Sequence, residues 1–276
     1  MADLTTVEKA KRRVRVYRGR VARMAPGTGL RHRCAFMHVP KCGGTSLSEA
    51  LYALVPLHKE IGVLDSPSIR RAMALREAGV DDRVTFHDEG AHADKVARFR
   101  ETLLLMHMAH GATLVHGHFL FSERAYERFG DDYRYVTILR EPIARTVSNY
   151  RMAHENGVFP GTLDEFLDSE MGRRMAQHGL RYFAGQATVA EGTESALLER
   201  AKANMARFSV IGFLEELPAF TSAFGDTFGV RPSVGHSNRG AGERPKVTDA
   251  QMRCLEELCA PDIELNRHAR TLGACA

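Results

Sequence analysis

The 276-residue sequence has no uninterrupted apolar run that is long enough to span a membrane. Its N-terminus is basic but lacks the apolar core of a signal peptide. Cysteine is scarce, odd in number and without the spacing of a metal site: Cys34, Cys42, Cys254, Cys259 and Cys275. We therefore expect reduced thiols and a cytoplasmic location, and we expect no metal.

Acidic side chains are absent from residues 9–33, which hold ten Lys or Arg residues. The formal net charge of the chain is +4, so the remainder is net acidic. A net-acidic body with one basic arm is not typical of a nucleic-acid-binding surface, and we expect no nucleic-acid partner.

The basic arm also carries an apolar stripe with helical spacing. The stripe consists of Val7, Ala10, Val14, Tyr17, Val21 and Met24. We predict that residues 1–25 form a basic amphipathic helix and that residues 30–276 form one domain. Three partners are open for the helix: the body of the protein, a second copy in a homo-oligomer, or an anionic membrane. The acidic body favours the first two over membrane contact.

Beyond the arm, short apolar segments alternate with helical patterns. Strands are predicted at 35–39, 83–87, 113–116, 135–139 and 210–212. The rest of the C-terminal half is mostly helical, with capping boxes at 162–165 and 248–251. This order predicts an α/β fold, in which helices flank a central, mainly parallel sheet of about four to five strands. Ligands of such folds bind beyond the carboxyl ends of the strands.

A phosphate-binding loop follows the first predicted strand. Gly43 and Gly44 allow a tight turn, and Thr45 or Ser46 then caps a helix. Free backbone N–H groups and the helix dipole make such a helix start an anion site. Lys41 stands at its lip, where an ammonium group reaches a phosphate or a leaving oxygen. The loop differs from G-x-x-x-x-G-K-[ST], because its lysine precedes the glycines.

Positions 40–46, Pro-Lys-Cys-Gly-Gly-Thr-Ser, resemble the 5′-phosphosulfate loop of sulfotransferases that use 3′-phosphoadenosine-5′-phosphosulfate (PAPS). They are most similar to carbohydrate sulfotransferases related to heparan sulfate 2-O-sulfotransferase, in which threonine stands where Cys42 is here. The resemblance implies a P-loop-like sulfotransferase fold with PAPS as co-substrate and Lys41 as the residue that neutralises the leaving oxygen. The implied 5′-phosphate-binding residues are Lys41, Cys42, Gly43, Gly44, Thr45 and Ser46.

A second motif lies at the end of the strand 135–139. Arg140 leaves this strand, and Ser148 lies about two turns into the next helix. A guanidinium fork and a hydroxyl can hold a terminal phosphate together. The pair resembles the 3′-phosphate motif of the same enzymes, in which a serine follows the arginine after eight residues. Arg145 is a further candidate.

The third motif is His116-Gly117-His118, after the strand 113–116. An imidazole titrates near neutrality and can accept a proton from an alcohol. The heparan sulfate 2-O-sulfotransferase branch carries a similar triplet whose second histidine is the base, which implies this role for His118. His116, His87, Asp88 and Glu89 remain the alternatives. A weaker candidate is the glycine-rich segment 232–245, whose Arg239 and Gly240 would close over the nucleotide.

Taken together, the motifs indicate a sulfotransferase that moves a sulfuryl group from PAPS to a hydroxyl, with a carbohydrate as the expected acceptor. Two alternatives stay open. A P-loop kinase would need a Mg²⁺-binding carboxylate at a strand end, and no predicted strand ends in aspartate. A non-enzymatic protein could instead bind polyanions through the basic arm. The acceptor itself is not revealed by the sequence.

Overall fold

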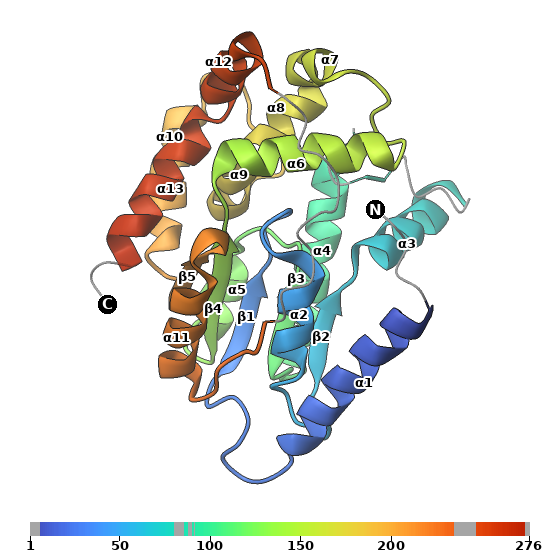
Figure 1. Ribbon diagram of the computed structural model, residues 1–276, viewed down its shortest axis with the longest axis vertical. Helices are drawn as coiled ribbons and strands as arrows, with labels where there is room; N and C mark the ends of the chain where they lie inside the picture. The colour runs from blue at the N-terminus through green and yellow to red at the C-terminus, as the bar shows by residue number, and fades with distance from the viewer. Residues whose placement is uncertain (1–5, 80–85, 88–89, 91, 235–246, 274–276) are drawn as a thin grey trace.

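A computed structural model describes residues 6–79, 86–87, 90, 92–234 and 247–273. Its centre is a five-stranded parallel sheet in the order β2-β3-β1-β4-β5 (Figure 1). The strands are β1 (Arg33–Met37), β2 (Ile61–Leu64), β3 (Leu114–Gly117), β4 (Tyr133–Leu139) and β5 (Val210–Phe213). The predicted α/β fold with a mainly parallel sheet is thereby confirmed.

Helices cover both faces of the sheet. Figure 1 shows α2 and α11 in front of the sheet and α4 and α5 behind it. The helices before residue 142 are α1 (Thr6–Ala22), α2 (Gly44–Tyr52), α3 (Ser66–Ala78), α4 (Ala93–Ala109) and α5 (Glu123–Phe129). The later ones are α6 (Pro142–Glu155), α7 (Leu163–Asp168), α8 (Glu170–Ala176), α9 (His178–Ala184), α10 (Glu194–Met205), α11 (Leu217–Phe228), α12 (Asp249–Leu258) and α13 (Ala260–Gly273), with a 3-10 turn at Leu214–Glu216. The C-terminal half is helical, as predicted.

The three central strands are almost entirely buried, as expected for a parallel sheet covered on both faces. In the register of the sheet, Phe36 of β1 lies between His116 of β3 and Val136 of β4. The carboxyl ends of β1, β3 and β4 therefore meet at one edge. This is the edge at which Lys41, His118 and Arg140 leave the sheet.

One predicted strand is wrong in position. The edge strand β2 lies at Ile61–Leu64, where no strand was predicted, and Phe86 and His87 are not in a strand. Residues 83–85 of the predicted strand lie outside the described residues. Gly62 is in β2 because α4 crosses so closely that a Cβ there would come within 2.5 Å of the His107 ring.

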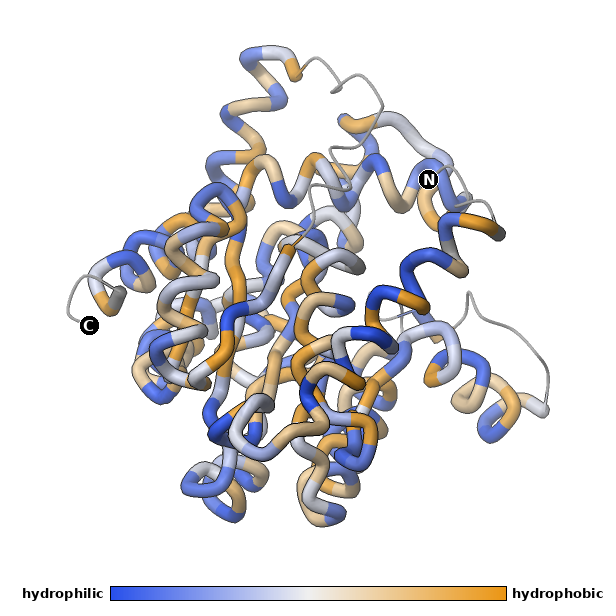
Figure 2. Tube along the Cα trace, turned by 60° about the horizontal axis from the view of Figure 1, so that its bottom comes forward, coloured by the Kyte–Doolittle hydropathy of each residue, from blue (hydrophilic) through white to orange (hydrophobic). Residues whose placement is uncertain are grey.

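Several helices begin and end at residues with recognisable capping signals. Asp65 accepts a hydrogen bond from Ser68 N and caps α3, which Gly79 ends in the left-handed conformation. Both predicted capping boxes are present, at the starts of α7 and α12. Helix α1 lies at the periphery and carries both hydrophobic and hydrophilic residues along its length (Figure 2). None of the described helices combines the length and the apolar character that crossing a membrane requires.

Candidate functional site

The loop between β1 and α2 has an unusual backbone. Lys41 has a φ of 65°, and Gly43 and Gly44 have φ values of 94° and 36°. A left-handed conformation is uncommon for a residue with a Cβ and costs on the order of 1 kcal/mol or more. Such strained residues cluster at ligand-binding sites, where the surrounding structure holds them in place.

The N-terminus of α2 has no side-chain cap. The residue at the cap position is Gly43, so the prediction that Thr45 or Ser46 caps this helix is wrong, and both residues lie in its first turn. The cause is the tight turn, which starts the helix two residues earlier. Gly43 has no side chain that could accept from the first-turn N–H groups, and the partial positive charge of this helix start is directed toward the carboxyl edge of the sheet.

Three cations converge beside this loop. Arg140 Nη1 lies 3.4 Å from the carbonyl oxygen of Lys41. Burial first, and then the charges of Arg151 and Arg140, lower the pKa of Lys41 below its ordinary value, while Glu155 opposes this shift. A partly buried group of like charges is unfavourable by itself, so this arrangement favours an anion between the three side chains.

Ser148 lies on the helix face that carries Arg151 and Glu155. These residues are separated by three and four positions along α6, which places them one above another. Arg151 Nε contacts Glu155 Oε1 at 3.5 Å, and both residues act electrostatically on Lys41. Sequence reasoning missed Arg151, although its spacing of three from Ser148 was a usable signal.

Arg145 is not a phosphate ligand in this arrangement. Its side chain is only 3% exposed, and Nη1 contacts Asp262 Oδ2 at 2.6 Å. Nη2 donates to the carbonyl of Ala176 at 2.5 Å. Asp262 also accepts from the backbone N–H groups of Gly179 and Leu180. Arg145 therefore joins α6 to α8 and α13, and through Asp262 to α9, and its charge is already balanced.

His116 faces α2 and has both ring nitrogens engaged. Nε2 lies 3.0 Å from Ser48 Oγ, and Nδ1 lies 2.8 Å from Tyr52 OH. The ring stacks on Phe36 with centroids 5.4 Å apart. Burial, and then the charge of His118, lowers the pKa of His116 to about 3. The neutral ring of His116, bound by the hydroxyl groups of Ser48 and Tyr52, therefore links the end of β3 to α2.

His118 is held through one of its two ring nitrogens. Its Nδ1 lies 2.6 Å from the backbone carbonyl of His38. A carbonyl only accepts hydrogen bonds, so Nδ1 carries a proton and the lone pair of the neutral ring is on Nε2. Arg100 of α4 holds this segment, because Nη1 donates to the carbonyl of His118 at 2.8 Å and Nη2 donates to Ser66 Oγ at 2.7 Å.

His38 is a third histidine of this edge, and sequence reasoning missed it. Its ring centroid is 4.7 Å from that of His118 and 5.4 Å from that of His116. It is buried, and its Nε2 has no hydrogen-bond partner. Burial, and then the charges of the other two histidines, lowers its pKa well below the ordinary value. Its position directly after β1 was the available signal.

Gly117 between the two motif histidines has a packing role. A Cβ at this position would lie 2.5 Å from Leu64 Cβ and 2.8 Å from the Leu64 carbonyl oxygen. Glycine at this position thus permits the close approach of the Leu64 backbone. The contact holds the end of β3 against the end of β2.

The other predicted candidates are not placed at this site by the described residues. His87 is buried but does not follow a strand. Within the described ranges, no three His, Cys, Asp or Glu side chains are placed to hold a metal ion together. The remaining predicted residues lie outside the described residues: Asp88, Glu89, Arg239 and Gly240.

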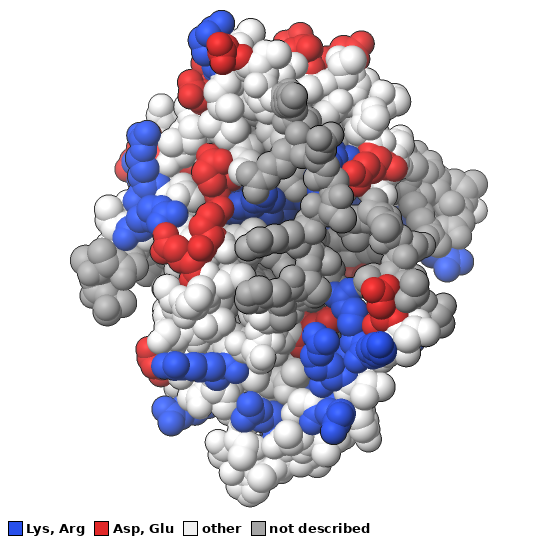
Figure 3. Space-filling model, viewed as in Figure 1, with Lys and Arg blue, Asp and Glu red and all other residues white. Residues whose placement is uncertain are grey.

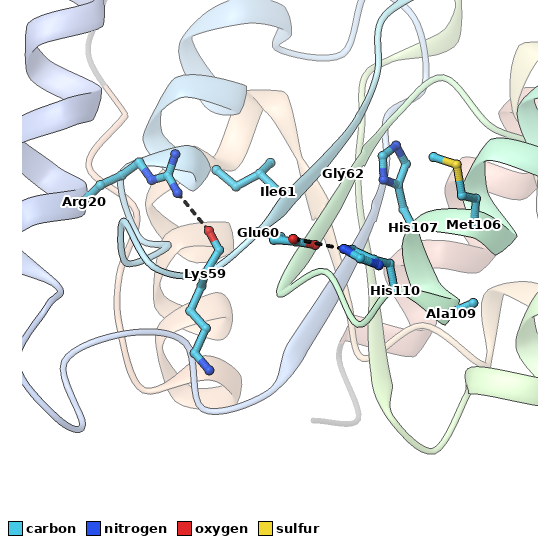
Figure 4. A pocket seen from close by; sticks show the side chains of 9 residues that line it. All are labelled: Arg20, Lys59, Glu60, Ile61, Gly62, Met106, His107, Ala109 and His110. Atoms are coloured by element: carbon cyan, nitrogen blue, oxygen red, sulfur yellow. Dashed lines mark hydrogen bonds and ion pairs between the residues drawn. The ribbon is translucent and has the colours of Figure 1, made fainter.

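A cavity of about 760 Å³ opens elsewhere, beside the start of β2. Figure 4 shows that Arg20 of α1 reaches the backbone carbonyl of Lys59, and that Glu60 and His110 point toward each other. These polar groups bind one another. The cavity lies at the amino end of β2, and Lys41 follows the carboxyl end of β1, so the two belong to opposite edges of the sheet.

Comparison with known proteins assigns the chain. A profile described as the sulfotransferase family matches residues 30–182, more than half of the sequence. A comparison with curated proteins found no match. The matched segment extends from before β1 into α9 and includes the loop after β1, both motif histidines, Arg140 and Ser148. The chain belongs to the sulfotransferase family.

Proposed function

We propose that this protein transfers a sulfuryl group from PAPS to a hydroxyl of a carbohydrate acceptor. Family membership supports a sulfotransferase. The observation that supports a nucleotide donor is the convergence of Lys41, Arg140 and Arg151 beside the uncapped start of α2. The acceptor class is supported by the similarity of the loop and of the histidine triplet to carbohydrate sulfotransferases.

Two parts of the structure bind the nucleotide: the loop at the start of α2, and Arg140 together with α6. Backbone N–H groups from Gly43 to Ser46 hold the 5′-phosphosulfate at the helix start, whereas the N–H of Cys42 already donates to the Val39 carbonyl at 3.3 Å. Arg140 and Ser148 hold the 3′-phosphate, with Arg151 adding positive charge on the same face of α6. The left-handed turn at Lys41 and Gly43 supports this fit, because it exposes successive N–H groups to an anion.

Lys41 serves the leaving group. When the bond between sulfur and the bridging oxygen breaks, negative charge grows on the phosphate oxygen of the nucleotide. An ammonium group already in place stabilises that charge without reorganisation. The lowered pKa of Lys41 helps further, since its proton is given more easily to this oxygen.

His118 serves the acceptor. Its Nε2 takes the hydroxyl proton while the acceptor oxygen forms the new bond to sulfur, and the bond from sulfur to the nucleotide breaks. The His38 carbonyl holds Nδ1 and so aims Nε2, and Arg100 fixes the backbone. These contacts position the reacting groups, which lowers the entropic part of the barrier.

The P-loop kinase alternative requires a Mg²⁺-binding carboxylate at the end of a strand. Contrary to the expectation from sequence, an aspartate does follow a strand: Asp65 comes directly after β2. Its Oδ2 accepts from Ser68 N at 3.0 Å. Glu141, after β4, accepts from Ile143 N and Ala144 N. Both carboxylates cap helices, so neither is arranged for Mg²⁺ in the way a P-loop kinase requires.

We also propose that the enzyme works in the cytoplasm. The four described cysteines are free thiols, and three of them are buried: Cys34, Cys42 and Cys259. Burial raises the pKa of Cys42 to about 12, so its thiol is inert at neutral pH. Unpaired thiols are typical of reducing compartments.

The experiment that tests the proposed function is transfer itself. Purified protein is incubated with PAPS and candidate polysaccharides, and mass spectrometry follows both the acceptor and released 3′-phosphoadenosine 5′-phosphate (PAP). We expect an added sulfuryl group and one PAP for each transfer, and neither product with His118→Ala. Phosphorylation of an acceptor from Mg-ATP, without sulfation from PAPS, would contradict the proposal.

A further inference from the structure

Helix α1 is attached to the body through its basic side and not through its apolar stripe. Arg12 Nε contacts Glu49 Oε1 of α2 at 2.8 Å. Arg20 donates to the carbonyls of Val55, Pro56 and Lys59 after the end of α2, at 3.0, 3.1 and 2.9 Å. Cationic groups at the C-terminal end of a helix also complement its dipole.

The attachment is close as well as polar. A Cβ at Gly19 would lie 2.6 Å from Ala53 Cβ, so α1 approaches α2 without room for a side chain. The residues on this inner side are Arg12, Val16, Gly19, Arg20 and Arg23, all partly buried. The orientation of α1 about its own axis is therefore fixed.

The fixed orientation leaves the apolar stripe outside. Met24 is exposed just beyond the end of α1, and four large apolar side chains of the helix itself face solvent: Val7, Val14, Tyr17 and Val21. Their spacing of three to seven residues keeps them on one side of the helix. A contiguous apolar face of this kind on a surface helix indicates a partner.

The stripe is bordered by positive charge. Lys11, Arg13, Arg15 and Arg18 are exposed, and none of the four makes an ion pair with another described residue. Figure 3 shows Lys and Arg side chains gathered over α1. On the helical wheel, Lys11 and Arg18 lie on one side of the stripe and Arg13 lies on the other.

We propose that the outer face of α1 binds the surface of a membrane that contains anionic lipids. An apolar stripe of moderate width with cations along both borders suits a helix that lies in the interface plane. The apolar residues supply modest insertion, Tyr17 suits the headgroup level, and the cations bind lipid phosphates and carboxylates. The proposal uses none of the donor or acceptor residues and goes beyond the proposed function.

A second copy of the chain fits this face less well. Two α1 helices that paired through their stripes would place bordering cations opposite bordering cations, whether they ran parallel or antiparallel. Like charges across such a seam are destabilising. An anionic surface complements the same borders along the whole length of the helix. This charge argument reverses the order of partners that the sequence alone favoured.

The first test compares two matched substitutions. Val14 on the stripe is 55% exposed, and Met106 on α4 is 52% exposed and lies off the stripe. Val14→Glu and Met106→Glu introduce the same charge at equal exposure. We expect the parent and Met106→Glu to float with vesicles of phosphatidylcholine and phosphatidylserine, and Val14→Glu to stay in solution. Equal flotation of the two variants would overturn the proposal.

The second test removes charge. Arg15→Gln with Arg18→Gln should weaken binding to the same vesicles roughly 30-fold, about fivefold for each cation near the surface. The control is Arg253→Gln with Arg267→Gln, two exposed arginines of α12 and α13, which should bind as the parent does. Binding of the parent to pure phosphatidylcholine as strong as to the mixed vesicles would also overturn the proposal.

Solution mass separates the competing partner. In the absence of lipid, we expect the parent and the Val14→Glu variant to have the same solution mass. A dimer that Val14→Glu dissociates, together with no vesicle binding by the parent, would assign the stripe to a second copy. PAP binding serves as the check of folding for every variant, because none of the substituted residues belongs to the proposed nucleotide site.

Discussion

Arg140 and Arg145 are five residues apart, yet they occupy opposite electrostatic environments. Arg145 is fully buried, and its guanidinium is matched by Asp262 and two backbone carbonyls. Arg140 is half-buried next to Lys41, and among the described residues its guanidinium meets only the loop carbonyl of Lys41, at 3.4 Å. A charge that is already balanced holds the protein together, whereas cations that Glu155 compensates only in part are arranged for a ligand.

The same contrast separates the two regions around them. The cluster of Arg145, Asp262 and the start of α9 satisfies its charges internally. The edge around Lys41 gathers cations, a strained residue and an uncapped helix start. Changes in the first region should affect folding, and changes in the second should affect nucleotide binding and turnover.

The largest effect is expected from Arg145→Ala. It leaves the buried Asp262 carboxylate without its ion-pair partner, which should lower the free energy of unfolding by about 3–5 kcal/mol. Urea denaturation measures the change. The matched control is Arg140→Ala, which makes the same substitution and should cost little stability. Equal losses for the two variants would remove the distinction between the regions.

Lys41→Ala should lower turnover by roughly 100-fold or more, because the charge of the leaving oxygen loses its stabilising cation. Affinity for PAP should change much less, since the backbone of the loop remains. Steady-state kinetics and calorimetric PAP binding measure the two quantities separately. A variant with near-parental turnover would show that Lys41 does not serve the leaving group.

Arg140→Ala should weaken PAP binding by roughly 10-fold to 100-fold, the range expected when a charged hydrogen bond is lost. Ser148→Ala should weaken it less, because the hydroxyl is neutral. Adenosine 5′-phosphosulfate has no 3′-phosphate and should bind both variants and the parent alike. Equal losses for the two nucleotides would mean that these residues hold another part of the ligand.

The smallest effect is the dependence of stability on pH. The folded protein keeps the pKa of His116 near 3, below the value of about 6.5 that is usual for an unfolded chain. Below pH 6.5 the unfolded state therefore binds more protons, and stability should fall by about 1 kcal/mol between pH 7.5 and pH 5.5 for this residue. Urea denaturation at the two pH values should show a smaller fall in His116→Gln. An equal fall in the variant would contradict the burial argument.

The central strands and the loop could be predicted because their signals are local. An apolar segment, two glycines and a lysine in immediate succession define the loop within a few residues. The edge strand β2 could not be predicted in the same way. Ile61-Gly62-Val63-Leu64 is short and contains glycine, which strands disfavour, and the reason for Gly62 is the close approach of α4 from more than 40 residues away.

The site residues also divide into those with a local sequence signal and those that depend on contacts between distant segments. Lys41, His118 and Arg140 could be predicted as site residues because each follows a strand in the sequence, and the structure places all three at one edge of the sheet. The difference between Arg140 and Arg145 depends on Asp262, more than 100 residues away, and no local pattern reveals that partner. The exposure of the α1 stripe likewise depends on the contacts of Arg12 and Arg20 with the body.

The central claim is that the edge around Lys41 binds a nucleotide that carries both a 5′- and a 3′-phosphate. The most direct measurement is the melting temperature of the parent and of Arg140→Ala with PAP, adenosine 5′-monophosphate or Mg-ATP, since a ligand of the folded state raises it. We predict that PAP raises the melting temperature of the parent most, and that Arg140→Ala loses most of this rise. A rise with Mg-ATP larger than that with PAP, or equal rises with PAP and adenosine 5′-monophosphate, would contradict the account.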